Sequence, residues 1–430
     1  MMTLSRLLPV DGGGGWPLAR FGSAVPCPAM ARTVLRGGRI FDGTDQLRDG
    51  DVVVEDGRII GVGLDLDGDT AVDCAGHTLL PGLFDCHVHL AVTDINALRR
   101  QQTPFSLNFY EAIENMRVTL ATGITTARDA AGADLGMKAA VEQGLVAGPR
   151  LQISITMLSQ TGGHGDDWQV CGAIVPSFFV PYPGVPDPIV DGPDEMRRRV
   201  RELVRAGADV IKVATSGGVL SPRDDPRHGH FRDAELAVLV EEATAAGRFV
   251  MAHAQATEGI KAAIRNGIRS IEHGIYLDDE AIGMMLDRGT YLVPTLVAPL
   301  GVLEARDRGV PVPQVMIDKT VMVMETHAAS IRAAVDAGVK VAMGTDSGVA
   351  PHGQNLRELE LMVGCGMTPA EALVATTRTA AELMGLEEEL GALEVGKRAD
   401  VVVVEGDPLA DLSTLGTRVR QVWKDGARVV

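Results

Sequence analysis

The chain has 430 residues, of which 46% are hydrophobic and 23% charged, so it can bury a large core and overall disorder is excluded. The formal net charge of −17 argues against nucleic acid or a membrane as main partner, because both require a basic face, and we expect a small-molecule substrate. The five cysteines are scattered and lack Cys-x-x-Cys spacing, which favours a reducing, cytoplasmic setting.

The first 31 residues differ in composition from the rest of the chain. They contain a glycine run at 12–15, and the apolar run at 7–10 is too short for the core of a signal peptide. We interpret residues 1–31 as a disordered extension, with Met30 as an alternative start of translation and a secretory leader as the alternative interpretation. No run approaches the roughly 18 apolar residues that indicate a membrane helix.

Short strands with turns follow the extension and return at the far end of the chain. The stretch 51–63 alternates β-branched residues with Asp-Gly turn signals, and 419–426 has the same character. We therefore predict a small β-sandwich built from residues 32–80 and 386–430, with the middle of the chain inserted between its two parts.

The middle of the chain, residues 81–385, alternates strand patterns with helical patterns such as 193–206 and 233–246. This alternation is typical of a parallel sheet, and eight strands predict an α/β fold of the (β/α)8 TIM barrel type. An open doubly wound sheet is the weaker alternative, because no Gly-x-Gly-x-x-Gly turn follows the first strand. The strand candidates are the stretch ending at His89, then 124–129, 150–155, 210–215, 249–253, 270–273, 291–295 and 339–346.

Histidines close several of these strands, where a barrel of this type carries its functional groups. His87 and His89 are separated by one residue, so an extended strand places both imidazoles on one face, as half of a metal site. A solvent-exposed polar edge is the alternative. His253 and His273 end two adjacent strands, and although a single such histidine is more often structural, two together favour ligands.

Two further polar residues belong to this pattern. Lys212 lies within the apolar run Val-Ile-Lys-Val-Ala, where an unpaired ammonium would cost several kcal/mol. It is either neutralised by a buried carboxylate or deprotonated and converted by CO2 into a carbamate that can bridge two metal ions. Asp346 closes the eighth strand, and its alternative role is that of a helix N-cap.

Taken in order, these motifs resemble the binuclear amidohydrolase superfamily, over the chain from about residue 33 to 430. Within that superfamily, 159–166 and 351–355 are similar to prolidase-like and Xaa-Arg(Lys) carboxypeptidase members, with imidazolonepropionase-like hydrolases nearby. The motifs are Pro81-Gly82-x-x-Asp85-Cys86-His87-Val88-His89, Val-Ile-Lys212-Val-Ala-Thr-Ser-Gly-Gly, Ala252-His253-Ala254, Glu272-His273-Gly274 and Gly344-Thr345-Asp346.

The resemblance implies two divalent metal ions, with zinc expected and manganese or cobalt as alternatives. The scissile carbonyl would be attacked by a metal-bridging hydroxide, with Asp346 accepting its proton and passing it to the leaving amine. The implied ligands are His87, His89 and Asp346 for one ion and His253 and His273 for the other, bridged by N6-carboxylysine at Lys212.

Loop residues on the same face are candidates for contact with substrate. The resemblance implies that His164 meets the substrate carbonyl or its oxyanion, and His352 follows Asp346 closely enough to reach the pocket. A solvated loop is the better interpretation of the region that holds His228 and His230, although Arg223 or one of these histidines could meet a substrate carboxylate.

Three other positions enter this interpretation. Some prolidase-like relatives carry tyrosine near the position of Phe231, and a phenylalanine cannot donate a hydrogen bond, which weakens the case for dipeptidase activity. His77 and His327 have no ligand-like context, and His327 is expected on a surface helix.

We predict a cytoplasmic, binuclear metal-dependent hydrolase that releases a C-terminal amino acid from a dipeptide or an N-acyl amino acid. Opening of a cyclic amide, lactone or carbamate is the alternative on the same site. Deamination is disfavoured because it generally needs one metal and no Lys212. A non-catalytic scaffold is disfavoured because scaffolds lose ligands and all six are present. The resemblance also implies a homo-oligomer.

Overall fold

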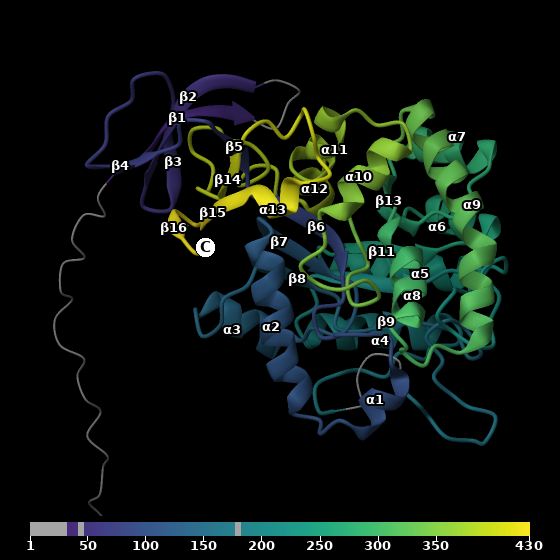
Figure 1. Ribbon diagram of the computed structural model, residues 1–430. Helices are drawn as coiled ribbons and strands as arrows, with labels where there is room; N and C mark the ends of the chain where they lie inside the picture. The colour runs from purple at the N-terminus through teal and green to yellow at the C-terminus, as the bar shows by residue number, and fades with distance from the viewer. Residues whose placement is uncertain (1–31, 42–46, 177–181) are drawn as a thin grey trace, which may run out of the picture.

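The computed structural model describes residues 32–41, 47–176 and 182–430, which form a small β-sheet domain beside a larger α/β barrel (Figure 1). The extension predicted for residues 1–31, with its alternative start at Met30, lies outside the described residues. Among the helices described, none is long and apolar enough to cross a membrane.

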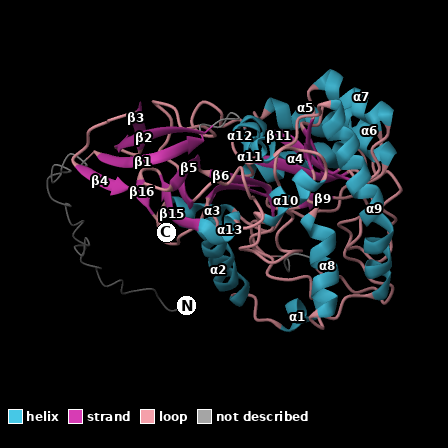
Figure 2. Ribbon diagram, turned by 45° about the horizontal axis from the view of Figure 1, so that its top comes forward, coloured by secondary structure: helices cyan, strands magenta, loops and turns pink. Residues whose placement is uncertain are grey.

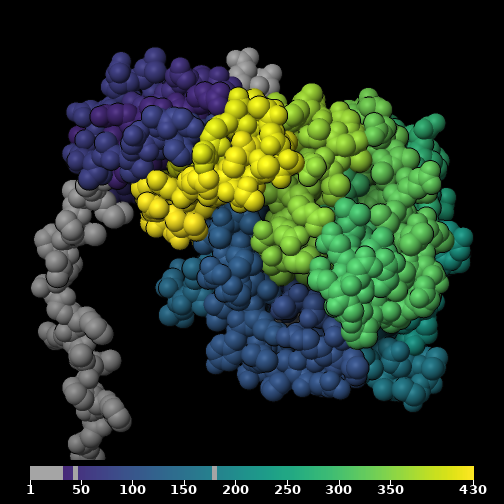
Figure 3. Space-filling model, viewed as in Figure 1, coloured from purple at the N-terminus to yellow at the C-terminus, as the bar shows by residue number. Residues whose placement is uncertain are grey.

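The small domain joins both ends of the chain in one hydrogen-bonded sheet. The sheet has the order β16-β15-β14-β5-β1-β2-β3, with β4 alongside β1. The junction between the ends is β14 against β5, where Val401 faces Pro81 in an antiparallel ladder. In Figure 3 the yellow C-terminal residues lie directly against the purple N-terminal ones. The strands are β1 (Thr33–Phe41), β2 (Leu47–Glu55), β3 (Arg58–Gly63), β4 (Thr70–Asp73), β5 (His77–Pro81), β14 (Val401–Glu405), β15 (Val419–Lys424) and β16 (Ala427–Arg428).

One residue separates β5 from the barrel, which consists of parallel strands whose side chains are mostly buried. Seven of the eight predicted strands are present, and the third is divided in two at Ile155, whose φ of 69° interrupts the ladder. The barrel strands are β6 (Leu83–Val88), β7 (Ile124–Asp129), β8 (Arg150–Ile153), β9 (Met157–Leu158), β10 (Val210–Ala214), β11 (Phe249–Ala254), β12 (Ser270–His273) and β13 (Tyr291–Val293).

The eighth side of the barrel is not a regular strand, which corrects the prediction for 339–346. Isolated bridges join Val341 to Leu292 and Ser347 to Val88, and the Cys86 amide donates to the Met343 carbonyl at 2.9 Å. Gly344 packs against the backbone of His87 so closely that a Cβ there would lie 3.0 Å from the His87 amide nitrogen. This segment therefore closes the barrel with single bridges where a continuous ladder was expected.

Helices surround the barrel strands, as the cyan ribbons in Figure 2 show. The two helices expected near 193–206 and 233–246 are α4 and α5. Pro193 opens α4 with Asp194 and Glu195 in its first turn, where acidic groups interact favourably with the helix dipole. The helices are α1 (Ala97–Gln102), α2 (Leu107–Ala121), α3 (Leu135–Glu142), α4 (Pro193–Arg205), α5 (Asp233–Ala245), α6 (Thr257–Arg265), α7 (Asp279–Arg288), α8 (Val297–Asp307), α9 (Gln314–Ala337), α10 (Arg357–Gly364), α11 (Pro369–Ala375), α12 (Arg378–Met384) and α13 (Leu415–Arg418).

Candidate metal centre

The carboxyl ends of the barrel strands surround one cavity, and the structure brings all six predicted ligands to its wall. Ring centroids are 5.5 Å apart for His87 and His89, 5.1 Å for His87 and His273, and 4.6 Å for His253 and His273. The ligand atoms of His87, His89 and Asp346 lie within 4.8 Å of one another. The six residues are His87, His89, Lys212, His253, His273 and Asp346.

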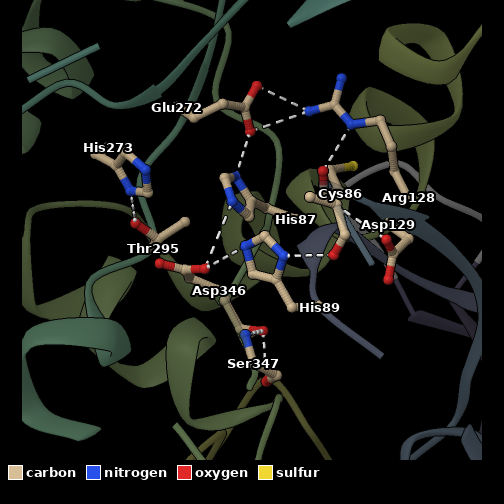
Figure 4. A network of polar contacts seen from close by, with 12 residues as sticks. Cys86, His87, His89, Arg128, Asp129, Glu272, His273, Thr295, Asp346 and Ser347 are labelled. Atoms are coloured by element: carbon tan, nitrogen blue, oxygen red, sulfur yellow. Dashed lines mark hydrogen bonds and ion pairs between the residues drawn. The ribbon is translucent and has the colours of Figure 1, made fainter. Parts of the chain in front are cut away.

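The two histidines of β6 each have one ring nitrogen held by the protein. His87 Nδ1 lies 2.8 Å from Glu272 Oε2, and His89 Nδ1 lies 2.8 Å from the Ala131 carbonyl (Figure 4). Because a carboxylate and a carbonyl both accept, each Nδ1 carries a proton and each Nε2 faces the cavity. Nε2 faces Asp346 Oδ1, at 3.6 Å from His87 and 3.0 Å from His89.

Glu272, which orients His87, is held by a fully buried ion pair. Arg128 Nη2 lies 3.0 and 3.2 Å from its two carboxylate oxygens, and Ser270 Oγ donates to Oε1 at 2.5 Å. Arg128 also donates through Nε to the Cys86 carbonyl at 2.6 Å. The exposed fractions are 0% for Glu272 and 2% for Arg128. The sequence interpretation missed both residues, although each is a charged residue inside an otherwise apolar or small-residue strand.

In the second histidine pair, too, a protein group holds one ring nitrogen of each imidazole. His253 Nε2 lies 3.1 Å from the Gly217 carbonyl, which leaves Nδ1 with the lone pair. His273 Nδ1 lies 2.7 Å from Thr295 Oγ1, so Nε2 is left free of protein contacts among those described. Burial holds the pKa of both imidazoles well below the usual range. Both rings are therefore neutral, which is the form that binds a metal ion.

The amine of Lys212 is buried in the cavity wall without a hydrogen-bond partner among the described residues. Its side chain is 1% exposed, and Nζ has no hydrogen-bond partner within the described part of the chain. Burial lowers the pKa of the amine to about 8, against the opposing influence of Glu272 and Asp346. An unpaired buried amine is costly, and metal-bound carboxylation of this amine would satisfy it. The donor set of four imidazoles, a carboxylate and this lysine therefore fits a pair of divalent ions.

Four residues at or after the ends of barrel strands have strained backbone conformations. Ile155, His273, Thr295 and Asp346 all have positive φ, at 69°, 73°, 52° and 57°. Such conformations cost about 1–3 kcal/mol each and persist where surrounding structure enforces them, often at functional sites.

At Asp346, burial opposes ionisation, but the hydrogen bond with His89 and the nearby charges outweigh it and lower the carboxyl pKa.

His164 reaches the cavity from the segment after β9. Its ring stacks on His253 with centroids 4.1 Å apart and an interplanar angle of 18°. Its Nδ1 lies 2.7 Å from Ser221 Oγ and 3.2 Å from Asp224 Oδ2, and Lys319 of α9 binds the other oxygen of Asp224 at 3.0 Å. The sequence interpretation missed Asp224 and Lys319, because only the folded chain brings α9 to this loop.

The other predicted substrate contacts lie outside the cavity lining as described. Arg223 and His228 are exposed, with the Arg223 guanidinium 5.3 Å from the Trp168 ring. His230 is buried, and His352 Nε2 lies 2.9 Å from the Val92 carbonyl. A role for these four residues in binding substrate stays a prediction.

His327 corrects one expectation, because it is 2% exposed and lines the cavity from α9. Its Nε2 lies 2.9 Å from both the His273 and the Pro294 carbonyls. The helix on which it lies was expected at the surface, and one face of that helix packs against the barrel mouth. Burial lowers the pKa of His327 to about 4, so the ring is neutral and Nε2 donates.

A barrel with imidazoles, a carboxylate and a buried lysine at its strand ends defines a metal-dependent hydrolase. The chain matches the model of the Amidohydrolase family over residues 78–429, and it therefore belongs to that family. As members of this family generally do, it has a candidate site for a divalent metal, at His87, His89 and Asp346.

Named relatives agree on the class of reaction. The chain is 34% identical over 422 residues to ochratoxinase of Aspergillus niger, covering 92% of this chain and 86% of that protein. It is 27% identical over 401 residues to imidazolonepropionase of Geobacillus sp. (strain WCH70), covering 84% of each. A solved Xaa-Pro dipeptidase with methionine bound in its active site superposes with a TM-score of 0.84 at 33% identity, covering 92% of this chain and 99% of that one. The protein is a hydrolase acting on carbon–nitrogen bonds.

Proposed function

We propose that the protein hydrolyses a dipeptide or an N-acyl amino acid and releases its C-terminal amino acid, using two divalent ions, with zinc as the expected metal. The observation that carries this proposal is the convergence of four imidazoles, Asp346 and the unpaired Lys212 on one cavity. Ochratoxinase, at 34% identity, and the Xaa-Pro dipeptidase, at 33%, support hydrolysis of an amide or peptide bond.

The proposal for Lys212 is that its amine is carboxylated. The low pKa leaves a substantial neutral fraction near pH 7 to 8, and the neutral amine adds to CO2 to form a carbamate with loss of one proton. The product is a carboxylate on a long stem, and it replaces an unsatisfied donor by an anion directed at the histidines. His87, His89 and Asp346 would hold one ion, and His253 and His273 the other.

The metal pair would lower the pKa of a bound water and polarise the scissile carbonyl. Asp346 would take the proton released as water attacks and deliver it to the departing amine, since an ionised carboxylate at the cavity wall can serve as base and then as acid. His164 would contact the substrate carbonyl, with its ring fixed by Ser221 and Asp224.

Three further predictions accompany this function. The described cysteines are all free, which supports the proposed cytoplasmic setting. A homo-oligomer is proposed from the family resemblance. Phe231 is buried and presents no hydroxyl, which favours N-acyl amino acids over dipeptides as substrates.

A second candidate is opening of a cyclic amide, lactone or carbamate. The observation in its favour is the 27% identity with imidazolonepropionase. The same ligands and the same proton transfer would serve, because only the connection between the two products differs.

The test is release of free amino acid from a panel of dipeptides and N-acyl amino acids, with zinc-loaded protein and bicarbonate. Release from members of the panel is expected, and the preferred members identify the C-terminal residue. A protein that binds two metal ions per chain but releases nothing from the panel would contradict the proposal and favour cyclic substrates. Fewer than one ion per chain after metal-replete expression would revive the scaffold alternative.

A further inference from the structure

The cavity beside the metal ligands has two apolar walls. One comes from β9 and the loop after β10 and includes Val219 and Leu220. This wall is next to His164, because a Cβ added at Gly218 would collide with the His164 ring. Ile275 joins it in a small apolar cluster with Val219. We refer to Met157, Val219, Leu220 and Ile275 as the His164 wall.

The second wall comes from the start of α8 and the segment after Asp346. A Cβ added at Gly301 would lie 2.7 Å from the Cα of Ala350, so α8 packs directly on that segment. The wall therefore lies next to Asp346. We refer to Ala298, Pro299, Val302 and Val349 as the Asp346 wall.

The charged groups near the cavity belong to the metal site or bind a protein partner. Asp346 is the one acidic residue in the described lining, and it faces His87 and His89. Lys212 is the one lysine or arginine in that lining, and it belongs to the metal site. Lys319, near the His164 wall, binds Asp224. A charged substrate side chain would enter the cavity without a partner, which is costly away from water.

The two walls contact different halves of the substrate. His164 contacts the carbonyl in the proposed reaction, so the acyl half lies on its side of the cavity. Asp346 delivers the proton to the leaving amine, so the released amino acid lies against the Asp346 wall. Both assignments rest on the proposed function.

We propose that the released amino acid carries an uncharged apolar side chain, such as that of leucine, methionine or phenylalanine, which packs on Ala298, Pro299, Val302 and Val349. Lysine, arginine and acidic residues are excluded because this wall offers them no partner. The specificity differs from that of the Xaa-Arg(Lys) carboxypeptidases that the motifs of this chain resemble. Burial of a leucine-sized side chain favours binding by roughly 10- to 100-fold.

The first experiment measures binding without turnover. N-methylphosphonate derivatives of leucine, asparagine and lysine present the same tetrahedral group with different side chains, and calorimetry on the metal-loaded protein gives their dissociation constants. We expect the leucine compound to bind at least tenfold more tightly than the other two. Asparagine is nearly isosteric with leucine, so that comparison isolates polarity from size. Equal binding of the three compounds, or no binding of the leucine compound, overturns the inference.

The second experiment adds one negative charge to the Asp346 wall. Pro299 lies in the first turn of α8 and is only partly buried, so Pro299→Glu and Pro299→Gln should both fold. We expect the Glu variant to raise kcat/KM for lysine release relative to leucine release at least tenfold over the Gln variant. If the ratio of kcat/KM for lysine release to that for leucine release is the same in both variants, the side chain of the released amino acid does not lie at Pro299. That result overturns the inference.

The two proposals fail in different ways. Release of amino acids without preference for apolar residues contradicts the specificity alone. Preferential binding of the leucine phosphonate without hydrolysis of any N-acyl amino acid or dipeptide contradicts the proposed reaction alone.

Discussion

Histidines on strands and histidines on loops behave differently in this protein. Each strand histidine has one ring nitrogen held by a neighbouring group and the other directed at the cavity. Among the loop histidines, His164 reaches the cavity, but His228 is exposed and His352 binds the Val92 carbonyl away from the cavity lining. Parallel strands converge at one end of a barrel and fix the direction of their terminal side chains, whereas a loop imposes no such direction. The strand histidines are His87, His89, His253 and His273.

Removing Lys212 should have the largest effect on the strand-borne site. Lys212→Ala should lose the second metal ion and lower kcat/KM by at least about 10³-fold, because several kcal/mol of transition-state stabilisation depend on the metals. Propionate should restore part of the activity by occupying the place of the carbamate. Metal content and steady-state kinetics measure both. Lys340→Ala is the control, since Lys340 is an exposed lysine of the same protein. Full activity of Lys212→Ala without propionate would exclude a carbamate bridge.

Asp346→Asn tests whether this strand-end carboxylate carries the proton. We expect kcat to fall by about 10²- to 10⁴-fold, the usual contribution of general acid–base catalysis, because an amide cannot accept the proton. Turnover is compared only between preparations with equal metal content. Wild-type turnover with both metals bound would show that another group transfers the proton.

Glu272→Gln tests the group that orients a strand histidine. The variant leaves Arg128 buried without a counterion, which should cost about 3–5 kcal/mol of the free energy of unfolding. Metal affinity should fall by about 10- to 100-fold as His87 loses its orientation. Chemical denaturation and chelator competition give the two values. Glu114→Gln, in the exposed pair with Arg117, should change stability by less than about 1 kcal/mol. Unchanged metal affinity in Glu272→Gln would contradict the orienting role.

His228→Asn should have the smallest effect, because this loop histidine is exposed and lies outside the described cavity lining. We expect kcat/KM to stay within about threefold of wild type, as for most exposed substitutions. The measurement uses the preferred substrate of the panel. A tenfold loss would show that His228 meets the substrate, which is one alternative from the sequence.

The residues that sequence reasoning missed share one property. Glu272 and Asp224 each hold a histidine, and Arg128 and Lys319 hold these two carboxylates, so that every partner is distant in the chain. Glu272 lies 185 positions from His87, and Asp224 lies 60 positions from His164. A charged residue in an apolar strand signals that a partner exists but does not identify it. His327 was misassigned for the same reason, since helical periodicity does not tell which face meets the barrel mouth.

The sequence by itself determined the family, the barrel, the joining of both chain ends in one sheet and the residue types at the strand ends. These follow from local pattern, because alternation of strands and helices allows few folds and strand ends converge in only one place. The tertiary structure decided which ring nitrogen of each strand histidine is held by a neighbouring protein group and that the eighth side of the barrel is irregular. It also decided that the cavity walls are apolar. Those features depend on contacts between distant segments, and only the folded chain makes these contacts.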